Sequence, residues 1–471
     1  MLAFVRKATA AVVCLGVLAS GASADATDRL AEAVRFRTVS PQDPADFDPA
    51  PFLAFHAFLE EEFPATHETL QRETVAGYSL LYTWVGSDPA LPPVILAAHQ
   101  DVVPVVPGSL ARWSEPPFGG VVTDGYIWGR GTLDDKVGVL GLLEAVESLV
   151  RSGFEPRRTF YLAFGHDEEI GGDAGAASIT ALLAARGVRA WFSLDEGLAI
   201  VEGVGGVEGA MATVGVAEKG FLTLEITATA VGGHSSMPPR RTAIGKLARA
   251  VTRLEARPMP AHLGGRSGEL LEALSVQLPW PQRFSISQRW LFALPLERAL
   301  SRDPVTNALI RTTTAVTMVR GGVKENVLPS EASAVVNFRV HPQDTAAEVI
   351  AHVREVLGPD FEIAVLTSNE ASPVSSTEST GYAVLTEAIA EFAPEVPIVP
   401  ALVVGGTDSK HYGQIAEDAY RFSPLWFSPE DRQRIHGIDE RISVAFYRRV
   451  PLFFQDLIRR ASAASSEGPS R

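Results

Sequence analysis

The chain has 471 residues, of which 46% are hydrophobic and 21% charged, and its formal net charge is −15. A chain of that length exceeds what one compact core usually holds, so the sequence predicts two domains. The acidic balance argues against nucleic acid as a partner. The single cysteine, Cys14, lies in a leader-like segment, so a processed chain would have no thiol for a disulfide or a metal site.

The first 24 residues have the pattern of a secretory signal peptide. Arg6 and Lys7 form a charged start, residues 8–18 form a short apolar run, and residues 22–24 are a small-residue cleavage site. The apolar run is shorter than an ordinary membrane span. We therefore expect a periplasmic or secreted protein, with an uncleaved N-terminal membrane anchor as the alternative.

After the leader, predicted helices and strands alternate through the first half of the chain. Apolar residues recur at helical spacing in residues 27–35, 51–62 and 137–150. Continuous apolar runs predict strands in residues 80–86, 94–98, 159–164 and 190–194. Strands of this kind are typical of a mostly parallel sheet that is buried on both faces. In such sheets, ligands bind outside the carboxyl ends of the strands.

Polar residues capable of binding a metal follow three of these predicted strands. They are His99 and Asp101, then Glu168 and Glu169, then Asp195 and Glu196. Each pair alone has an ordinary explanation, such as a histidine bonded to a backbone carbonyl or a solvated acidic loop. Adjacent carboxylates repel each other and are costly to bury, however, so the recurrence indicates a cation nearby.

Two further candidates come from loops. Asp134 lies just before the helix at 137–150, where a helix cap and a metal ligand are both open interpretations. His436 follows a loop rich in Ser and Pro, and we expect it to open a final helix. With His99, Glu169 and Asp195 these residues form a nitrogen and oxygen ligand set that suits zinc, or manganese and cobalt, rather than calcium. Five ligands exceed the four that one zinc usually takes, so two metals sharing a bridging carboxylate fit better.

Residues 219–367 are predicted to form a smaller α+β lid domain. Its strands are expected at 221–228, 312–319, 332–340 and 361–365, and its helices at 243–256 and 346–357. The catalytic domain would comprise residues 25–218 and 368–460, followed by a disordered tail at 461–471. Within the lid, an insert at 262–311 is rich in large apolar residues. It would form either a core between added helices or a wall for a long acyl chain.

The chain resembles the dinuclear zinc peptidases and amidases that include aminoacylase, glutamate carboxypeptidase and carboxypeptidase S. The matching stretches cover nearly the whole mature chain, in the family's order. They are AAHQDVVPV, WGRGTLDDK, FGHDEEIGG, LDEG, GGHSSMPP, KENVLPS, GGTDSKHY and IHGIDE. The match is closest to the carboxypeptidase S branch, which also holds secreted N-fatty-acyl-amino-acid hydrolases. The resemblance implies an α/β zinc-peptidase domain, with a mostly parallel central sheet flanked by helices, and an inserted α+β lid.

The resemblance also implies two zinc ions and a ligand for each role. His99 and Asp195 would bind one ion, Glu169 and His436 the other, and Asp134 would bridge them. Glu168 would be the general base, and Asp101 would orient His99 through its other ring nitrogen. Relatives hold the peptide bond after the bridging aspartate in cis, so the bond between residues 134 and 135 is expected to be cis.

Substrate-binding groups are implied on the lid and near the GGTDSK stretch. By match they are His234, which would support the scissile carbonyl oxygen, and Asn326 and Arg339, which would bind a substrate carboxylate. Relatives often have Arg where this chain has Lys410. Because Lys cannot form the bidentate fork of Arg, we expect carboxylate recognition at this position to be looser or shifted.

These features predict a hydrolase of amide bonds next to a free carboxylate, either a carboxypeptidase or an N-acyl-amino-acid amidohydrolase. A non-catalytic binding relative is one alternative, although Glu168 argues against it because a binder needs no base. A zinc aminopeptidase is another, but it would need an acidic group for the substrate amine, where this chain offers Asn326 and Arg339. The expected partner is a small-molecule substrate, and a homodimer through the lid is one option.

Overall fold

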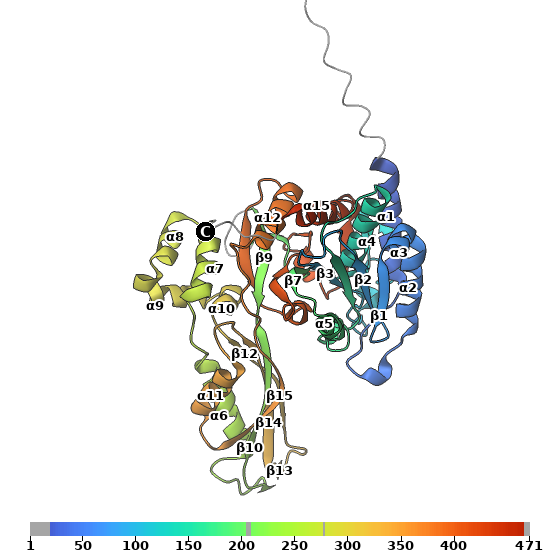
Figure 1. The fold of residues 1–471 in the computed structure, drawn as a ribbon. Helices are drawn as coiled ribbons and strands as arrows, with labels where there is room; N and C mark the ends of the chain where they lie inside the picture. Colours follow the sequence, from blue (N-terminus) through green and yellow to red (C-terminus); the bar gives the residue numbers. More distant parts are fainter. Residues whose placement is uncertain (1–18, 204–208, 277, 466–471) are drawn as a thin grey trace, which may run out of the picture. The chain divides into compact units, whose positions relative to one another are not determined.

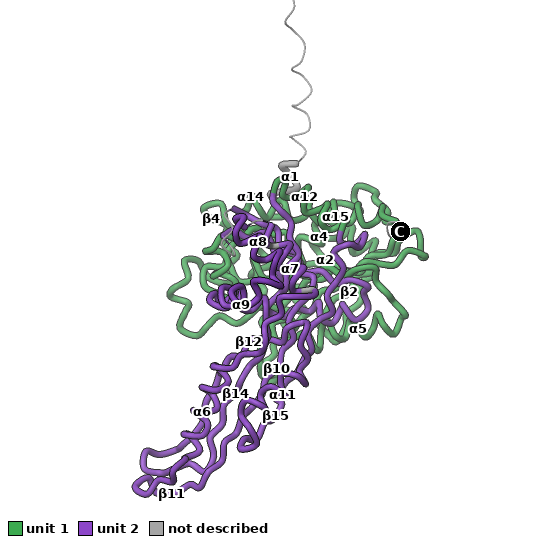
Figure 2. Tube along the Cα trace, turned by 90° about the vertical axis from the view of Figure 1, so that its left-hand side faces the viewer, with its two compact units in different colours: residues 1–196, 383–395, 423–471 green, residues 197–382, 396–422 purple. Residues whose placement is uncertain are grey.

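The computed structural model describes residues 19–203, 209–276 and 278–465. They form two compact units, drawn in different colours in Figure 2. The first comprises Met1–Glu196, Ala383–Glu395 and Ser423–Arg471, and the second Gly197–Tyr382 and Val396–Phe422. The second unit therefore includes more than the predicted lid at 219–367. It does so because the chain is nearly continuous there: strand β9 (Ala210–Glu218) runs into β10 (Gly220–Thr229) with only Lys219 between them.

Strands of the first unit pair in the order β1-β2-β6-β3-β7 (Figure 1). Their bounds are Gln71–Val75, Ser79–Trp84, Phe160–Gly165, Val94–His99 and Ala190–Asp195, in that spatial order. β3 pairs in parallel with both β6 and β7, whereas β2 pairs antiparallel with β6 and β1. All residues of β3 and β7 are buried, as the continuous apolar runs predict. The mostly parallel central sheet is thus confirmed.

Helices of the first unit cover this sheet. They are α1 (Ala19–Arg35), α2 (Ala50–Glu62), α3 (Pro64–Thr69), α4 (Lys136–Arg151), α5 (Ala176–Ala185), α12 (Thr380–Phe392), α14 (Val444–Tyr447) and α15 (Val450–Ala463). α4 contacts β3 and is covered in turn by α15, while α5 contacts β2 and β6. The apolar spacing that predicts α4 is borne out, since its leucines and its valines other than Val150 are buried.

The lid is a four-stranded antiparallel sheet with two helices. Its strand order is β12-β14-β10-β15, with bounds Thr313–Gly321, Glu331–Val340, Gly220–Thr229 and Phe361–Asn369. Helices α6 (Ala243–Ala256) and α11 (Ala346–Leu357) pack against it. Side chains of β10 and β14 alternate between buried and partly buried, so one face forms a core with the two helices. The predicted lid elements are present within a few residues of their expected bounds.

The second unit also contains strands β8 (Ile200–Glu202), β9, β16 (Ile398–Val403) and β17 (Ala416–Arg421), of which β9 pairs with the other three. The short strands β11 (Gly233–His234) and β13 (Val327–Leu328) pair with each other, and helix α13 spans Ser409–Tyr412. The insert forms helices α7 (Gly265–Ser275), α8 (Trp280–Ser287), α9 (Arg289–Leu300) and α10 (Pro304–Ile310).

The two chain ends depart from the predictions in different ways. The predicted disordered tail starts too early, because α15 continues to Ala463. The charged start and apolar run of the predicted signal lie outside the described residues. Among the helices that the structure describes, none combines the length and apolar character needed to cross a membrane.

Candidate metal centre

The central candidates lie at the carboxyl ends of three neighbouring strands of the first unit. His99 is the last residue of β3 and Asp195 the last residue of β7, and they are 1% and 3% exposed. Glu168 and Glu169 form a 3₁₀ turn directly after β6. Because these strands are parallel, their carboxyl ends share one edge of the sheet. The sheet itself therefore brings the three motifs together.

Asp134 lies between two histidines. Its Oδ1 is 2.9 Å from His99 Nε2 and its Oδ2 is 2.9 Å from His436 Nε2. His436 Nε2 is also 3.1 Å from Glu169 Oε2. Each oxygen of the Asp134 carboxylate thus faces a different imidazole, as a carboxylate that bridges two cations would.

The helix cap beside this site belongs to Asp135, not to Asp134. The Asp135 side chain accepts the backbone N–H of Gly138 at 3.2 Å and so caps α4. The Asp134–Asp135 peptide bond is cis, as the resemblance implies. The sequence left a helix cap and a metal ligand open for Asp134. The geometry of its carboxylate favours the metal ligand.

A second group of candidate ligands contains Glu196, which the sequence analysis noted after a predicted strand but did not assign to a metal ion. Ligand atoms of His99, Glu168 and Glu196 lie within 4.8 Å of one another, as do those of His99, Asp134 and Glu169. Glu196 follows Asp195 immediately, so the two adjacent acids of the LDEG stretch were the sequence feature that pointed to a second candidate ligand here. Both residues stand at the end of β7, and the sequence alone does not tell which carboxylate turns toward His99.

Asp101 connects the two sides of this centre. Its carboxylate is fully buried and accepts the backbone N–H groups of Glu168 and Glu169, each at 3.1 Å. Its carbonyl oxygen is 3.0 Å from His99 Nδ1, and its Oδ1 is 3.4 Å from the same nitrogen. Asp101 thus orients the His99 imidazole, as expected, and also holds the turn at Glu168 and Glu169, which the sequence did not predict.

Glu440 holds the loop before Asp134 close to the chain after His436. Its buried carboxylate accepts the N–H groups of Gly131 and Leu133 at 2.9 and 2.8 Å and pairs with Arg130 at 2.6 Å. Strand β19 (Arg441–Ser443) then pairs with β5 (Tyr126–Trp128). These bonds fix two segments that carry candidate ligands and are about 300 residues apart in sequence.

His436 does not open a helix, contrary to the prediction. It lies in a turn with a φ of 58°, and a strand follows before α14 and α15. A positive φ is incompatible with the start of a right-handed helix and is uncommon for a histidine. The turn directs the imidazole at Asp134 and Glu169.

The electrostatics of this centre favour a cation. Burial raises the pKa of Glu169 and, with the repulsion of Asp134, holds the pKa of Glu196 well above its usual range. Hydrogen bonds that the ring donates to the carboxylates of Asp134 and Glu169 raise the pKa of His436 to about 10. A buried set that would otherwise need protons to balance its charge is the chemistry expected of a divalent-metal site. The imidazole and carboxylate donors fit zinc.

In the second unit, His234 and Asn326 lie together. His234 pairs with Val327 across β11 and β13, and Ser235 N–H donates to the Asn326 carbonyl at 3.2 Å. The Ser236 N–H donates to His234 Nδ1 at 3.2 Å. Since Nδ1 accepts a hydrogen bond, the neutral ring carries its proton on Nε2, which makes that exposed nitrogen a donor.

Arg339 is at the opposite end of the lid sheet. It pairs with Phe221 and Thr313, and its guanidinium lies 4.9 Å from the Phe221 ring centroid. Glu331, at the other end of β14, is eight residues away, which corresponds to roughly 26 Å of extended strand. β13 and His234 adjoin that far end (Figure 1). Within one lid, Arg339 and Asn326 therefore do not meet at one carboxylate.

Lys410 follows a segment that a buried network of the second unit holds. It is a partly buried residue of α13, and the preceding Thr407 donates its N–H and hydroxyl to Glu218 Oε2 at 3.1 and 3.0 Å. Arg421 Nε is 3.5 Å from the same carboxylate oxygen. Glu218 thus fixes the start of the loop that presents Lys410.

Residues 95–460 match the model of peptidase family M20/M25/M40. The chain belongs to this family. Among M20 relatives, "Probable carboxypeptidase S-like 2" of Dictyostelium discoideum is 42% identical over 92% of this chain and 84% of its own length. "N-fatty-acyl-amino acid synthase/hydrolase PM20D1" of Homo sapiens is 41% identical, covering 86% and 82%. "Carboxypeptidase S" of Saccharomyces cerevisiae is 32% identical, covering 88% and 81%.

Solved structures share the M20 fold. The M20 family metallo-carboxypeptidase Sso-CP2 from Sulfolobus solfataricus has a TM-score of 0.67 at 18% identity, covering 93% of this chain and 99% of its own. Human carnosine dipeptidase 1 has a TM-score of 0.63 at 15% identity, covering 95% and 98%. Together, the family and its relatives identify the chain as a metal-dependent hydrolase of amide bonds.

Proposed function

We propose that this M20 hydrolase uses two divalent metal ions, zinc by donor chemistry with cobalt or manganese as alternatives. The observation that carries the proposal is the Asp134 carboxylate, whose two oxygens each lie 2.9 Å from a different histidine. His99 and Asp195 would hold one ion and Glu169 and His436 the other, with Asp134 between them. Glu196 is a further candidate ligand for the ion at His99, because it shares a ligand group with that residue.

Glu168 is proposed as the general base. Two bound metal ions would supply Lewis acidity toward the scissile carbonyl and lower the pKa of an attacking water. Glu168 lies in the same cluster as His99 and is fixed through its N–H by Asp101, so it can accept a proton from that water and pass it to the leaving amine. His234 would donate from Nε2 to the carbonyl oxygen as negative charge develops there.

The proposed substrate is an amide next to a free carboxylate, either a peptide or an N-acyl amino acid. Support comes from the relatives whose names include carboxypeptidase S and N-fatty-acyl-amino acid hydrolase. Arg339, Asn326 and Lys410 are the candidate groups for the carboxylate. Arg339 lies at one end of the lid and Asn326 at the other. We therefore propose that, within one chain, only one of these two residues contacts the substrate carboxylate.

Two further parts of the proposal concern assembly and location. In a homodimer formed through the lid, Asn326 and His234 of one chain would contact a substrate at the metal centre of the other chain. Residues at both ends of the lid sheet could then contact substrate. The leader pattern of residues 1–24 supports export to the periplasm or the medium, with an N-terminal anchor as the alternative.

A substrate panel tests the proposed function. Purified, zinc-loaded protein is given N-acyl amino acids, dipeptides blocked at the N-terminus, and amino-acid amides with a free amine. We expect hydrolysis of the first two classes and little of the third, since the proposed contacts recognise a carboxylate. Preference for the free-amine substrates would favour an aminopeptidase. Binding without turnover across the whole panel would favour a non-catalytic relative.

A further inference from the structure

Helices α8 and α9 of the insert expose large apolar side chains that a globular surface usually covers. We call this set the α8–α9 face; its members and exposed fractions are Trp280 (71%), Phe284 (42%), Trp290 (76%), Leu291 (60%) and Leu294 (66%). All five lie within 15 residues of one another in the sequence. Single exposed apolar residues need no explanation, but a group of this size in one short segment indicates an interaction surface.

The exposed residues are not needed for the core of the insert. That core is a separate cluster formed by Leu271, Ile286, Leu296 and Ile310, each 8% exposed or less. The expectation of a core between added helices is therefore met by these residues, while the two tryptophans remain outside it. α8 and α9 each carry one apolar side toward this core and another toward solvent.

The α8–α9 face is continuous across the two helices. Trp280 and Phe284 are four residues apart on α8 and stack, with ring centroids 5.4 Å apart. Phe284 contacts Phe292 of α9 edge to face at 6.0 Å. α9 is kinked at Phe292, which lies between the exposed Trp290 and Leu294. Aromatic contacts thus join α8 to the kink of α9, and exposed apolar side chains lie on both sides of that kink.

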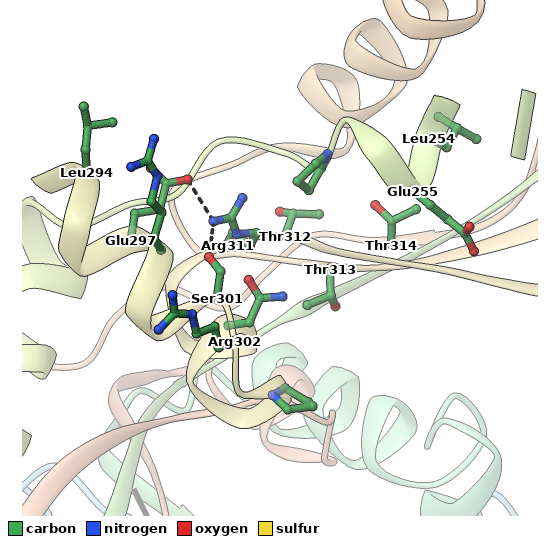
Figure 3. Close-up of a pocket in the computed structure, with 14 residues that line it drawn as sticks. Leu254, Glu255, Leu294, Glu297, Ser301, Arg302, Arg311, Thr312, Thr313 and Thr314 are labelled. Carbon is green, nitrogen blue, oxygen red and sulfur yellow. Dashed lines mark hydrogen bonds and ion pairs between the residues drawn. The ribbon is translucent and has the colours of Figure 1, made fainter. Parts of the chain in front are cut away.

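The segment that carries this face is positively charged, although the chain as a whole carries −15. From Trp280 to Asp303 there are four arginines and two acids, Glu297 and Asp303. Arg289 is paired with Glu272 at 3.0 Å, while Arg283, Arg298 and Arg302 are exposed. Figure 3 shows Glu297 turned to the buried Arg311, whose Nη2 lies 2.9 Å from Glu297 Oε1. Arg298 and Arg302 are exposed and line, with Leu294, a pocket of about 740 Å³.

We propose that the α8–α9 face docks this protein onto an anionic lipid surface. Tryptophan is enriched at membrane interfaces because its ring is apolar and its N–H is polar, and Phe and Leu insert beside it. Exposed arginines beside such a face attract anionic headgroups within about a Debye length. The charge complementarity with these headgroups, together with the interfacial preference of tryptophan, selects this occupant. The proposal does not depend on the catalytic assignment.

Vesicle sedimentation tests the proposal with the intact protein, whose N-terminus is recorded by mass spectrometry so that all variants carry the same leader state. The probes are vesicles of phosphatidylcholine, with or without phosphatidylglycerol. We expect the wild type to partition more strongly onto the anionic vesicles and to lose this preference at high salt. The double variant Trp280→Ser/Trp290→Ser should reduce partitioning at least about tenfold. Arg283→Gln/Arg302→Gln should reduce it on anionic vesicles only, by roughly fivefold per charge.

A matched control variant separates this face from exposed apolar residues in general. Leu53→Ser/Leu452→Ser removes side chains that are 53% and 58% exposed on α2 and α15, and it should bind vesicles like the wild type. Circular dichroism and urea midpoints verify that each variant is folded. Equal vesicle binding by the wild type and the double tryptophan variant would overturn the proposal. So would a dimer, formed without lipid, that the same variant disperses, because the face would then belong to a second copy.

Discussion

Replacing Asp101 with Asn tests whether one buried carboxylate positions both sides of the metal centre. Its oxygens accept two N–H groups at 3.1 Å, and one oxygen lies 3.4 Å from His99 Nδ1. An asparagine amide retains one acceptor but turns an NH₂ group toward the second donor. Losing a charge-assisted hydrogen bond costs ~1.5–3 kcal/mol, and leaving a buried N–H unpaired costs a further ~1–3 kcal/mol. We therefore expect the free energy of unfolding to fall by roughly 3–5 kcal/mol.

Urea unfolding, metal content and hydrolysis are measured together on this variant. Asp167→Asn is the matched control, because the buried Asp167 carboxylate accepts the N–H groups of Ala174 and Gly175 at 2.8 Å each. Both variants should lose similar stability. Only Asp101→Asn should also weaken metal retention and turnover, by about 10–100-fold. Equal losses of metal in the two variants, or native metal affinity in Asp101→Asn, would refute the positioning role.

Three further predictions concern single side chains. Glu168→Gln should lower turnover at least ~10²-fold with metal content unchanged, and loss of metal in elemental analysis would instead make Glu168 a ligand. Asp195→Asn should remove one metal ion while Glu196→Gln retains both; the reverse result in the same assay would assign the ligand role to Glu196. Burial lowers the pKa of Lys219 from 10.5 to about 7. Between those values the unfolded chain holds more protons, so stability from this residue rises with pH, and Lys219→Met should flatten urea midpoints between pH 7 and 10.5. An unchanged slope would contradict that pKa.

The sequence predicts the first unit's sheet well, and it brings the candidate ligands to one edge of that sheet, because both depend on local patterns. A continuous apolar run that ends in His99 or Asp195 identifies a buried strand and also places the residue that follows it. The helix before which Asp134 lies is predicted by spacing alone. What favours a ligand role for Asp134 over a cap is the contact with His436, about 300 residues away, and spacing carries no information on that contact.

The failures have physical causes of the same kind. His436 was expected to open a helix, but it lies in a turn with a positive φ. The chain after it is bonded to Arg130 at Gly437 and then pairs with β5 as strand β19. At the predicted domain boundary, residue 218, β9 runs into β10 almost without interruption, and local sequence patterns do not reveal that continuity. Large apolar residues such as the tryptophans of the insert are expected in a core from composition alone. The fold shows that Ile286 and Leu296 form that core instead, while the tryptophans are exposed.

Metal reconstitution tests the central claim most directly. The protein is stripped with a chelator, titrated with zinc, and assayed for bound metal and for hydrolysis of an N-acyl amino acid at each step. We predict that two ions bind per chain and that full activity returns only with the second, because the cluster from His99 to His436 offers more ligands than one zinc takes. Full activity with a single bound ion, or with none, would contradict the dinuclear account.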